Sequence, residues 1–344
     1  MRRLLTVVSV LALLLVPVGC KKNENGLRRF ERTYLDTFDT VVQLIAYDTD
    51  EAAFAEKAEQ IHRELQRYDA LYDIYEPKTG IHNLYTVNQN AGVSPVEVDE
   101  EILNLLQFGK EVHTFSGGRV NIASGAVLQL WHQARTMGLA NPEKATLPSD
   151  AALQAAAQHT DIRNLQLDKE QGTVYLADPA MRLDVGAIAK GYATEQVAKL
   201  AATLWEHAAI SAGGNVRVIG GKPDGAWEIG VEDPTGEQAL AATLMLRDQS
   251  LVTSGDYQRY YTVAGKRYHH IIDPATNYPS SYHQSVTVLC ADSALADALS
   301  TALFLMPIAD GRALLETFDG VEAMWISNGK TEMTEGFSQV RKTV

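Results

Sequence analysis

The sequence is short of cysteine and of positive charge, and each shortage excludes a class of protein. It has two cysteines, Cys20 and Cys290, so neither a disulfide framework nor a cysteine metal site is available. Its 30 basic residues stand against 43 acidic ones, for a net charge of −13. Nucleic-acid binding depends on clustered Lys and Arg, so this balance argues against nucleic acid as a partner. A small phosphorylated ligand needs only a few local donors or a metal, and the composition allows one.

Four signatures of common enzyme classes are also missing. There is no G-x-x-x-x-G-K-[ST] or G-x-G-x-x-G nucleotide-binding loop, no G-x-S-x-G nucleophile turn and no H-E-x-x-H zinc helix. The 344 residues are 46% hydrophobic and 21% charged, as expected of a folded protein with a sizeable core. Any functional site must therefore be assembled from less familiar parts.

The first twenty residues, MRRLLTVVSVLALLLVPVGC, have the layout of a secretory signal. Two arginines precede an apolar run that is short for a membrane span and ends at Gly19-Cys20. The ending resembles a lipobox, in which the cysteine is lipidated and becomes the mature N-terminus. We expect a lipoprotein signal peptide over 1–20, a polar tether over 21–30 and the folded domain over 31–344. The protein would then be exported and anchored to the cell membrane, on its extracytoplasmic face, by a lipid on Cys20. Cleavage of the signal nearby, without lipidation, is the alternative.

The hydrophobic pattern after the signal predicts helices and strands in mixed order. Apolar residues recur at helical spacing over 51–75, 99–115, 125–138 and 149–159. Strand-like segments begin with 40–47 and dominate after residue 208, where one helix is expected over 292–306. Because strands and helices do not alternate regularly, we expect an α+β fold with mixed, largely antiparallel sheets.

The segment RLDVGAIAKGYA (182–193) is typical of a strand, a tight turn and the start of a helix. Asp184 ends the predicted strand, Gly186 allows the turn, and the helix is expected to start at Ala187. Lys190 would lie one turn into that helix, whose N-terminus offers unpaired N–H groups and a partial positive charge. Such a place suits an anion. The alternative is an Asp N-cap beside an exposed lysine.

The segment DSALADALSTALFLM (292–306) predicts a mostly buried helix with oxygen donors on one face. Asp297 and Thr301 are four residues apart, with Ser300 beside them. A carboxylate with hydroxyls and backbone carbonyls suits a hard cation such as Mg²⁺. A capped or salt-bridged Asp is the alternative.

Three further stretches carry weaker signals. Paired glycines in ISAGGNVRVIG could let the backbone approach a ligand or simply make a turn, and SLVTSGDYQRYY places a polar turn between two strands. In RYHHIIDPATNYP (267–279), His270 lies on a predicted strand that leads to Asp273 and a turn. A single histidine is more often structural than catalytic, but two histidines and a carboxylate at one strand end suggest a site.

In this order, these segments resemble the ApbE family of flavin transferases, also called FAD:protein FMN transferases. FDTVVQL, LYDIYEPKTGIHNLYTVN and VNIASGAVLQLW match as well, so the resemblance covers 38–306. It implies two lobes around an FAD site and a Mg²⁺-dependent enzyme that splits the FAD pyrophosphate. The FMN phosphate would be joined to a Thr or Ser hydroxyl of a client protein, with release of AMP. Clients carry a D-x-x-[ST]-G-A-[ST]-like motif and are usually subunits of membrane redox complexes.

The resemblance also implies roles for particular residues. His270 would be the general base that deprotonates the acceptor hydroxyl, and Asp184 would act beside the pyrophosphate. FAD would be bound by Phe38, Tyr75, Ala123, Ser124, Gly125, Asp184, Lys190 and Ile271. Mg²⁺ would be bound by the carbonyl of Ala187 and by Asp297, Ser300 and Thr301. Asp273 would orient the turn or the histidine, and Asn277 replaces the glycine usual in that turn. Asn tolerates the left-handed conformation, so we expect the turn to be kept.

Two other functions fit the same sequence. The first is an FAD pyrophosphatase, which would pass FMN to water and would use the same metal and donor site. The second is a lipoprotein that only binds and carries flavin. A carrier needs neither an acid–base group nor a metal, so the presence of Asp184, His270, Asp297 and Thr301 argues against it.

Overall fold

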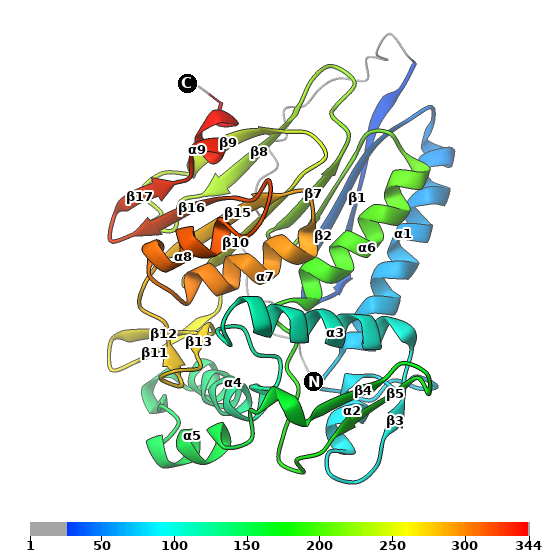
Figure 1. The fold of residues 1–344 in the computed structure, drawn as a ribbon. Coiled ribbons are helices and arrows are strands. Elements are labelled where there is room, and N and C mark those ends of the chain that lie inside the picture. Colours follow the sequence, from blue (N-terminus) through cyan, green and yellow to red (C-terminus); the bar gives the residue numbers. More distant parts are fainter. Residues whose placement is uncertain (1–25, 343–344) are drawn as a thin grey trace.

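The computed structural model describes residues 26–342, which form two lobes (Figure 1). The larger lobe is built on an eight-stranded sheet in the order β1-β2-β6-β7-β10-β15-β16-β17, in which every neighbouring pair is antiparallel. Its strands are β1 (Arg28–Thr37), β2 (Thr40–Asp48), β6 (Ala208–Ala212), β7 (Asn215–Ile219), β10 (Ser250–Gly255), β15 (Ser285–Cys290), β16 (Glu322–Ser327) and β17 (Lys330–Met333).

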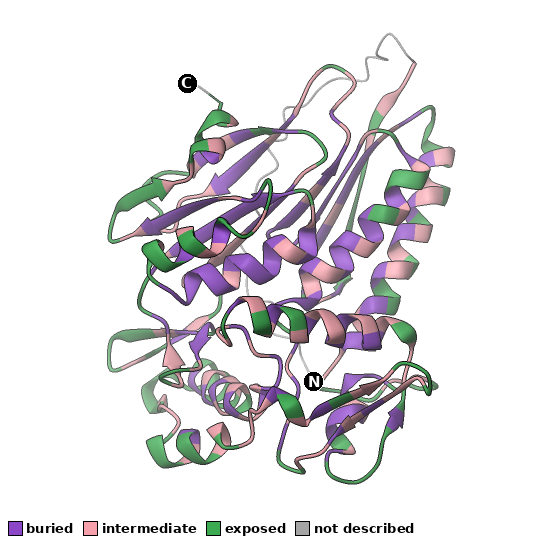
Figure 2. Cartoon of the chain, viewed as in Figure 1, coloured by how far each residue is buried: buried purple, intermediate pink, exposed green. Residues whose placement is uncertain are grey.

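Alternating side chains give this sheet two buried faces. On β2, Val42, Leu44 and Ala46 belong to the main core, whereas Ile45 belongs to the second core on the opposite face. The main core is covered by helices and the second core by a two-stranded ribbon and a short helix (Figures 1 and 2). These elements are α1 (Glu51–Tyr72), α6 (Ala189–Leu204), α7 (Ser293–Phe304) and α8 (Ile308–Leu315) on the first face, and β8 (Trp227–Glu232), β9 (Leu240–Leu246) and α9 (Glu335–Gln339) on the second.

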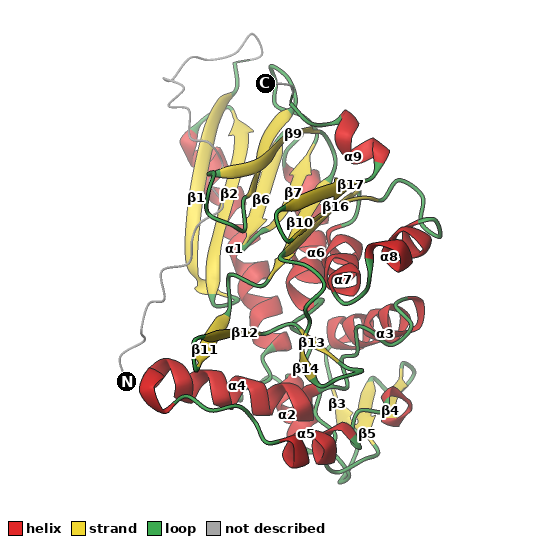
Figure 3. Cartoon of the chain, turned by 90° about the vertical axis from the view of Figure 1, so that its left-hand side faces the viewer, coloured by secondary structure: helices red, strands yellow, loops and turns green. Residues whose placement is uncertain are grey.

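The smaller lobe carries two groups of elements below the sheet (Figure 3). One group consists of α2 (Leu84–Gln89), β3 (Val96–Glu97), α3 (Glu100–Phe115), β4 (Leu165–Asp168) and β5 (Thr173–Leu176). The other consists of α4 (Gly125–Ala140), α5 (Asp150–Ala157), β11 (Tyr260–Val263), β12 (Lys266–His269), β13 (Ile272–Asp273) and β14 (Tyr278–Pro279). A third apolar cluster, which includes Trp131 and Tyr261, holds α4 against the β11–β12 hairpin.

The α+β prediction with largely antiparallel sheets is confirmed, and so are the four predicted N-terminal helices, with ends shifted by a few residues. Sequence patterns missed α2 and α8, which are only six and eight residues long. Strands were expected to dominate after residue 208, but Glu335–Gln339 near the end of the chain form the helix α9. β1 begins at Arg28, so the last three residues of the predicted tether are instead paired with β2.

Residues 1–20, with the predicted signal peptide and Cys20, lie outside the described residues. Within residues 26–342, no helix has the length and apolar character that crossing a membrane would require.

Candidate active site

One side of the candidate site forms where the segment at Ser124 meets the segment that leads to Asp184. The two segments touch there without forming regular strands. Ser124 and Arg182 make a single parallel bridge, Gly125 N donates to Arg182 O at 3.0 Å, and Asp184 N donates to Ile122 O at 2.9 Å. A Cβ on Gly125 would lie 2.4 Å from Arg182 O, so this approach requires glycine. The structure therefore brings the predicted Ala123, Ser124 and Gly125 beside Asp184. The strand expected to end at Asp184 is absent, because this segment pairs only at one bridge.

The position of Asp184 is fixed by a buried side chain on α2. Asn88 accepts a hydrogen bond from Leu183 N at 2.7 Å and donates to Leu183 O at 3.0 Å, as a neighbouring strand would. The Asp184 carboxylate accepts one hydrogen bond, from Gly186 N at 2.9 Å. Burial raises the pKa of Asp184 above its usual value, although that hydrogen bond and the nearby His132 and Arg259 favour the charged form. The Asp184 carboxylate can therefore accept further hydrogen bonds.

Helix α6 starts later than the sequence suggests. It begins at Ala189 rather than Ala187, and its N-cap Ile188 makes no side-chain hydrogen bond, so Asp184 is not a cap. The Ala189 amide already donates to Val185 O at 2.8 Å. Lys190 is therefore in the first turn, where its half-buried ammonium donates to Asn215 Oδ1 at 3.3 Å. The side chain of Lys190 thus adds its positive charge to this helix end.

The side chain of Asp297, a residue of α7, lies at the N-terminus of α6. It is only 5% exposed, and its Oδ2 accepts a hydrogen bond from Gly191 N at 2.7 Å. A Cβ on Gly191 would lie 2.3 Å from the Asp297 Cβ and 2.5 Å from Ser293 O, so only glycine lets the two helices come this close. Burial raises the pKa of Asp297, and the neighbouring Lys190 opposes that shift. Burial likewise lowers the pKa of Lys190, and Asp297 opposes that shift.

The backbone of Ala187 lies just before α6. Because this helix begins at Ala189, the amide of Gly191 is in its first turn and has no carbonyl acceptor within the helix. The Asp297 carboxylate is the acceptor instead. The carbonyl of Ala187, which the sequence predicts as a metal ligand, therefore lies outside the hydrogen bonds of α6.

Hydroxyl groups gather one turn further along α7. Ser300 Oγ donates to Asp297 O at 2.9 Å and lies 2.8 Å from Ser254 Oγ, and Thr301 Oγ1 lies 3.4 Å from the same serine oxygen. Ser254, at the end of β10, was seen in the sequence only as part of a weak polar turn. Among residues 26–342, no group of three or more His, Cys, Asp or Glu side chains could hold a metal. The predicted magnesium ligands include a single carboxylate, so they would form a different kind of site.

The two adjacent histidines have different environments. His269 ends β12 and is buried, with Nε2 donating to Ser280 O at 2.8 Å and Nδ1 accepting from Ile271 N at 3.2 Å. His270 follows the strand rather than lying on it, and its side chain is exposed. Although water reaches it, desolvation by the surrounding protein, then Arg259, His269, Arg135 and Lys190, holds the pKa of His270 well below 6.5. His269 is thus held by hydrogen bonds within the protein, whereas the side chain of His270 is accessible to other molecules.

The turn after His270 forms as predicted. Asp273 Oδ1 accepts from Ala275 N at 2.9 Å, and its carbonyl accepts from Asn277 N at 2.7 Å. Asn277 has φ of 61°, which confirms the left-handed conformation expected of the residue that replaces glycine. Ile271 is buried in the main core.

Four residues from three segments gather near Asp184 and His270, and only Tyr75 was expected there. Tyr75 is 58% exposed and contacts the ring of His132 of α4, with ring centroids 5.2 Å apart and the ring planes tilted by 32°. Burial and the nearby Asp184 raise the pKa of Tyr75 to about 12. Arg135 lies on α4, close to Arg259. Burial lowers the pKa of Arg135, and the positive charge of Arg259 lowers it further. Sequence patterns missed His132, Arg135 and Arg259 because each is an ordinary polar position on a helix or loop.

Phe38 lies in the two-residue turn between β1 and β2. Phe38 and Asp39 have φ of 56° and 48°, and the Phe38 amide donates to Asp69 Oδ1 at 2.8 Å. Positive φ is uncommon for a bulky residue. The neighbouring Asp39 carries its charge near Tyr75. This turn therefore lies beside the aromatic pair.

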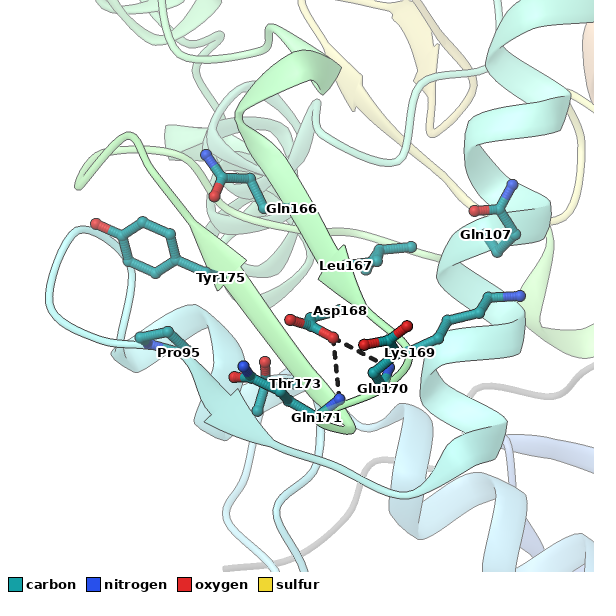
Figure 4. Close-up of a pocket in the computed structure, with 10 residues that line it drawn as sticks. All are labelled: Pro95, Gln107, Gln166, Leu167, Asp168, Lys169, Glu170, Gln171, Thr173 and Tyr175. Atoms are coloured by element: carbon teal, nitrogen blue, oxygen red, sulfur yellow. Dashed lines mark hydrogen bonds between the residues drawn. The ribbon is translucent and has the colours of Figure 1, made fainter.

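A separate pocket of about 670 Å³ lies in the smaller lobe, against the β4–β5 hairpin and α3 (Figure 4). Asp168 Oδ1 accepts hydrogen bonds there from the amides of Glu170 and Gln171, at 3.0 and 2.9 Å. None of the predicted site residues lines it. Its lining residues are Pro95, Gln107, Gln166, Leu167, Asp168, Lys169, Glu170, Gln171, Thr173 and Tyr175.

Known proteins resemble this chain over most of its length, in sequence and in fold. A model of the ApbE family matches residues 38–325. The chain is 33% identical to an FAD:protein FMN transferase of Treponema pallidum (strain Nichols), over 93% of this chain and 90% of that protein. It is 32% identical to one of Klebsiella pneumoniae (strain 342), over 84% and 86%. The ApbE protein of Thermotoga maritima superposes with a TM-score of 0.80 at 30% identity, over 92% and 100%. The flavin transferase ApbE from Vibrio cholerae shares the fold, with a TM-score of 0.76 at 23% identity over 91% and 99%.

Proposed function

The chain belongs to the ApbE family, and on that premise we propose how its own residues perform the transfer of FMN from FAD to a protein. The observation that carries the proposal is the pairing of two unlike groups of side chains. Lys190, Asp297, Ser300 and Thr301 gather at the α6–α7 junction, and the exposed His270 lies within electrostatic reach of Lys190. An anion-binding group and a base together are what phosphoryl transfer to a hydroxyl requires.

In this reaction a Ser or Thr hydroxyl of the acceptor attacks the phosphorus of the FMN half of FAD. A new phosphorus–oxygen bond forms to the acceptor, and the bond to the AMP phosphate breaks, so AMP leaves. The proton of the hydroxyl goes to a base, and His270 is neutral and exposed enough to take it. Lys190 offers positive charge to the diphosphate.

The residues at the α6–α7 junction fit a magnesium ion. Asp297 supplies a buried carboxylate, Ser300 and Thr301 supply hydroxyls, and the carbonyl of Ala187 lies just before the first residue of α6. Mg²⁺ is commonly bound through one or two carboxylates together with substrate phosphates. When bound, it would neutralise charge on the diphosphate oxygens.

The opposite wall would hold the rings of FAD. The exposed Tyr75 ring, in contact with His132, presents an aromatic surface beside Asp184, and the Phe38 turn lies next to it. Planar ring systems pack favourably on such surfaces. Ala123, Ser124 and Gly125 would contact FAD through their backbone, next to Asp184, and Ile271 would support the same wall from the core.

The acceptor and the location of the protein are also proposals. The acceptor would be a protein with a D-x-x-[ST]-G-A-[ST]-like sequence, such as a subunit of a membrane redox complex. Export and a lipid on Cys20 would hold the enzyme at the extracytoplasmic face of the membrane, where such a complex is reached. These rest on the sequence of residues 1–20 and on the family resemblance.

Hydrolysis of FAD to FMN and AMP is the second candidate function, because His270 is exposed and could equally serve a water molecule.

One experiment separates these functions. The full chain, purified in detergent, is mixed with FAD, Mg²⁺ and a protein that bears D-x-x-S-G-A-T, and both acceptor mass and AMP release are followed. A gain of one FMN per acceptor with matching AMP supports the transferase. AMP and free FMN with an unmodified acceptor would favour the pyrophosphatase, and bound but intact FAD would leave only a carrier.

A further inference from the structure

The surface beside His270 has an unusual charge for this protein. The chain carries 43 acidic and 30 basic residues, yet α4 and the residues between Asp256 and Asp273 contain no Asp or Glu. The charged residues of these two segments are Arg135, Arg259, Lys266 and Arg267, and we call them the cationic face.

The members of the cationic face lack carboxylate partners. Among the described residues, none of the four forms an ion pair within 4.0 Å, whereas some exposed cations elsewhere do, such as Lys342 with Glu228 at 2.9 Å. Arg267 instead lies over the Tyr260 ring at 4.8 Å, and Lys266 lies over the Tyr268 ring at 5.3 Å. These aromatic contacts hold the two cations on the hairpin. The carboxylates of Asp256 and Asp184 feel the charge of Arg267 and Arg259, respectively, but neither lies within ion-pair distance.

The cationic face is continuous with the mouth of the site. Arg135 and Arg259 are close enough to each other and to His270 to act on the pKa values of Arg135 and His270. The β11–β12 hairpin packs on α4 at Gly138, where a Cβ would lie 2.7 Å from the Tyr261 ring (Figure 3). Met137 and Leu139, at 63% and 56% exposed, lie on either side of Gly138 in the sequence. Exposed apolar side chains beside unpaired charge are typical of a surface that another molecule covers.

We propose that the cationic face binds an acidic surface of the acceptor protein and so delivers the acceptor hydroxyl to His270. The inference rests on the proposed transferase function and adds the chemistry of the partner. An acidic partner compensates four cations that this chain leaves unpaired. An anionic membrane could do so too, but a membrane seated here would cover the approach to His270, which an acceptor protein must reach.

The test compares two double variants of equal net charge in the full chain in detergent. Lys266→Glu with Arg267→Glu reverses the part of the cationic face that lies outside the proposed catalytic and FAD-binding residues. Lys199→Glu with Lys330→Glu reverses two exposed lysines on α6 and β17. The measurements are the KM for the D-x-x-S-G-A-T acceptor protein at several salt concentrations, and the Kd for FAD.

We expect the hairpin variant to raise the acceptor KM on the order of tenfold and to weaken its salt dependence, with the Kd for FAD unchanged. The control variant should keep the wild-type acceptor KM. An unchanged acceptor KM in the hairpin variant would overturn the inference, as would a loss of FAD affinity. Weaker sedimentation with phosphatidylglycerol vesicles at an unchanged acceptor KM would assign the face to the membrane instead. Failure of the wild-type chain to modify any acceptor would contradict the proposed function itself, which is a distinguishable result.

Discussion

The two sides of the candidate site differ in how far their polar groups are already paired. On the α6–α7 side, Asp297 is buried against Gly191 and Lys190, and Ser300 bonds both to the Asp297 carbonyl and to Ser254. On the His270 side, His270 and Arg259 are exposed, and neither Arg135 nor Arg259 forms an ion pair within the described chain. The polar groups of the α6–α7 side are thus already held in place by one another. Those of the His270 side remain accessible to other molecules.

This difference separates two tasks of the proposed reaction. A diphosphate needs fixed charges, because preorganised groups need no rearrangement as charge develops. A protein acceptor must enter and leave, so the base that serves it has to remain accessible. Substitutions on the two sides should therefore have different effects on activity and stability.

The largest effect is expected on the buried side. Asp297→Ala removes the only carboxylate of the proposed magnesium site, so kcat/KM for AMP release should fall on the order of a thousandfold. Asp310→Ala, at an exposed position of α8, is the control and should keep full activity. Retained far-ultraviolet circular dichroism would show that the variant folds, and activity within tenfold of wild type would refute the assignment of Asp297.

The adjacent histidines sharpen the comparison. His270→Ala should lower the transfer rate about a hundredfold or more, because the base is lost, while the Kd for FAD changes little. His269→Ala should instead lower stability by about 1–3 kcal/mol, since it leaves Ser280 O and Ile271 N unpaired. Single-turnover kinetics and thermal melts measure the two effects. An exchange of the two outcomes would mean that the histidine roles are reversed.

The close packing of α6 against α7 predicts that a larger side chain at their contact lowers the stability of the fold. Gly191→Ala should destabilise the fold by about 1–3 kcal/mol, because its Cβ meets Asp297 and Ser293 O. Gly225→Ala is the matched control, since a Cβ there has no neighbour within 4 Å. Urea unfolding of both variants gives the difference, and equal stabilities would show that the α6–α7 contact can relax.

The open side should respond to pH through its arginines. Burial, and after it Arg259 and other positive neighbours, hold the pKa of His270 well below 6.5, so the unprotonated base persists and kcat/KM should stay level from pH 8 to 6.5. Arg259→Gln removes one of these positive charges, which raises the pKa of His270 and moves the acid limb of the profile to higher pH. An acid limb that stays in place in the variant would mean that His270 does not control the profile.

The smallest effect is expected in the turn after His270. Asn277→Ala should cost about 1 kcal/mol, because φ of 61° is unfavourable for alanine, whereas Asn277→Gly should be close to neutral. Thermal unfolding of the two variants checks this. A similar loss in both would point to the Asn side chain rather than the backbone.

Several features of the site could be predicted from the sequence because they are local. The spacing of Asp297, Ser300 and Thr301 puts them on one helical face whatever surrounds the helix, and Asn277 kept the left-handed turn because its own backbone allows it. The strand expected before Asp184 was wrong for the opposite reason. Strand formation needs a partner, and here Asn88 and the segment at Ser124 supply only isolated hydrogen bonds.

The sequence by itself determined the longer helices, the largely antiparallel α+β class and most of the residues proposed for the site, since these follow from periodicity, backbone preference and motif. Only the tertiary structure decided which side chains meet across the chain. The bond from Gly191 to Asp297 spans 106 residues, and Tyr75, His132 and Arg259 gather from three separate segments. Such contacts depend on how helices and loops pack, and residue pattern along the chain carries no record of that packing.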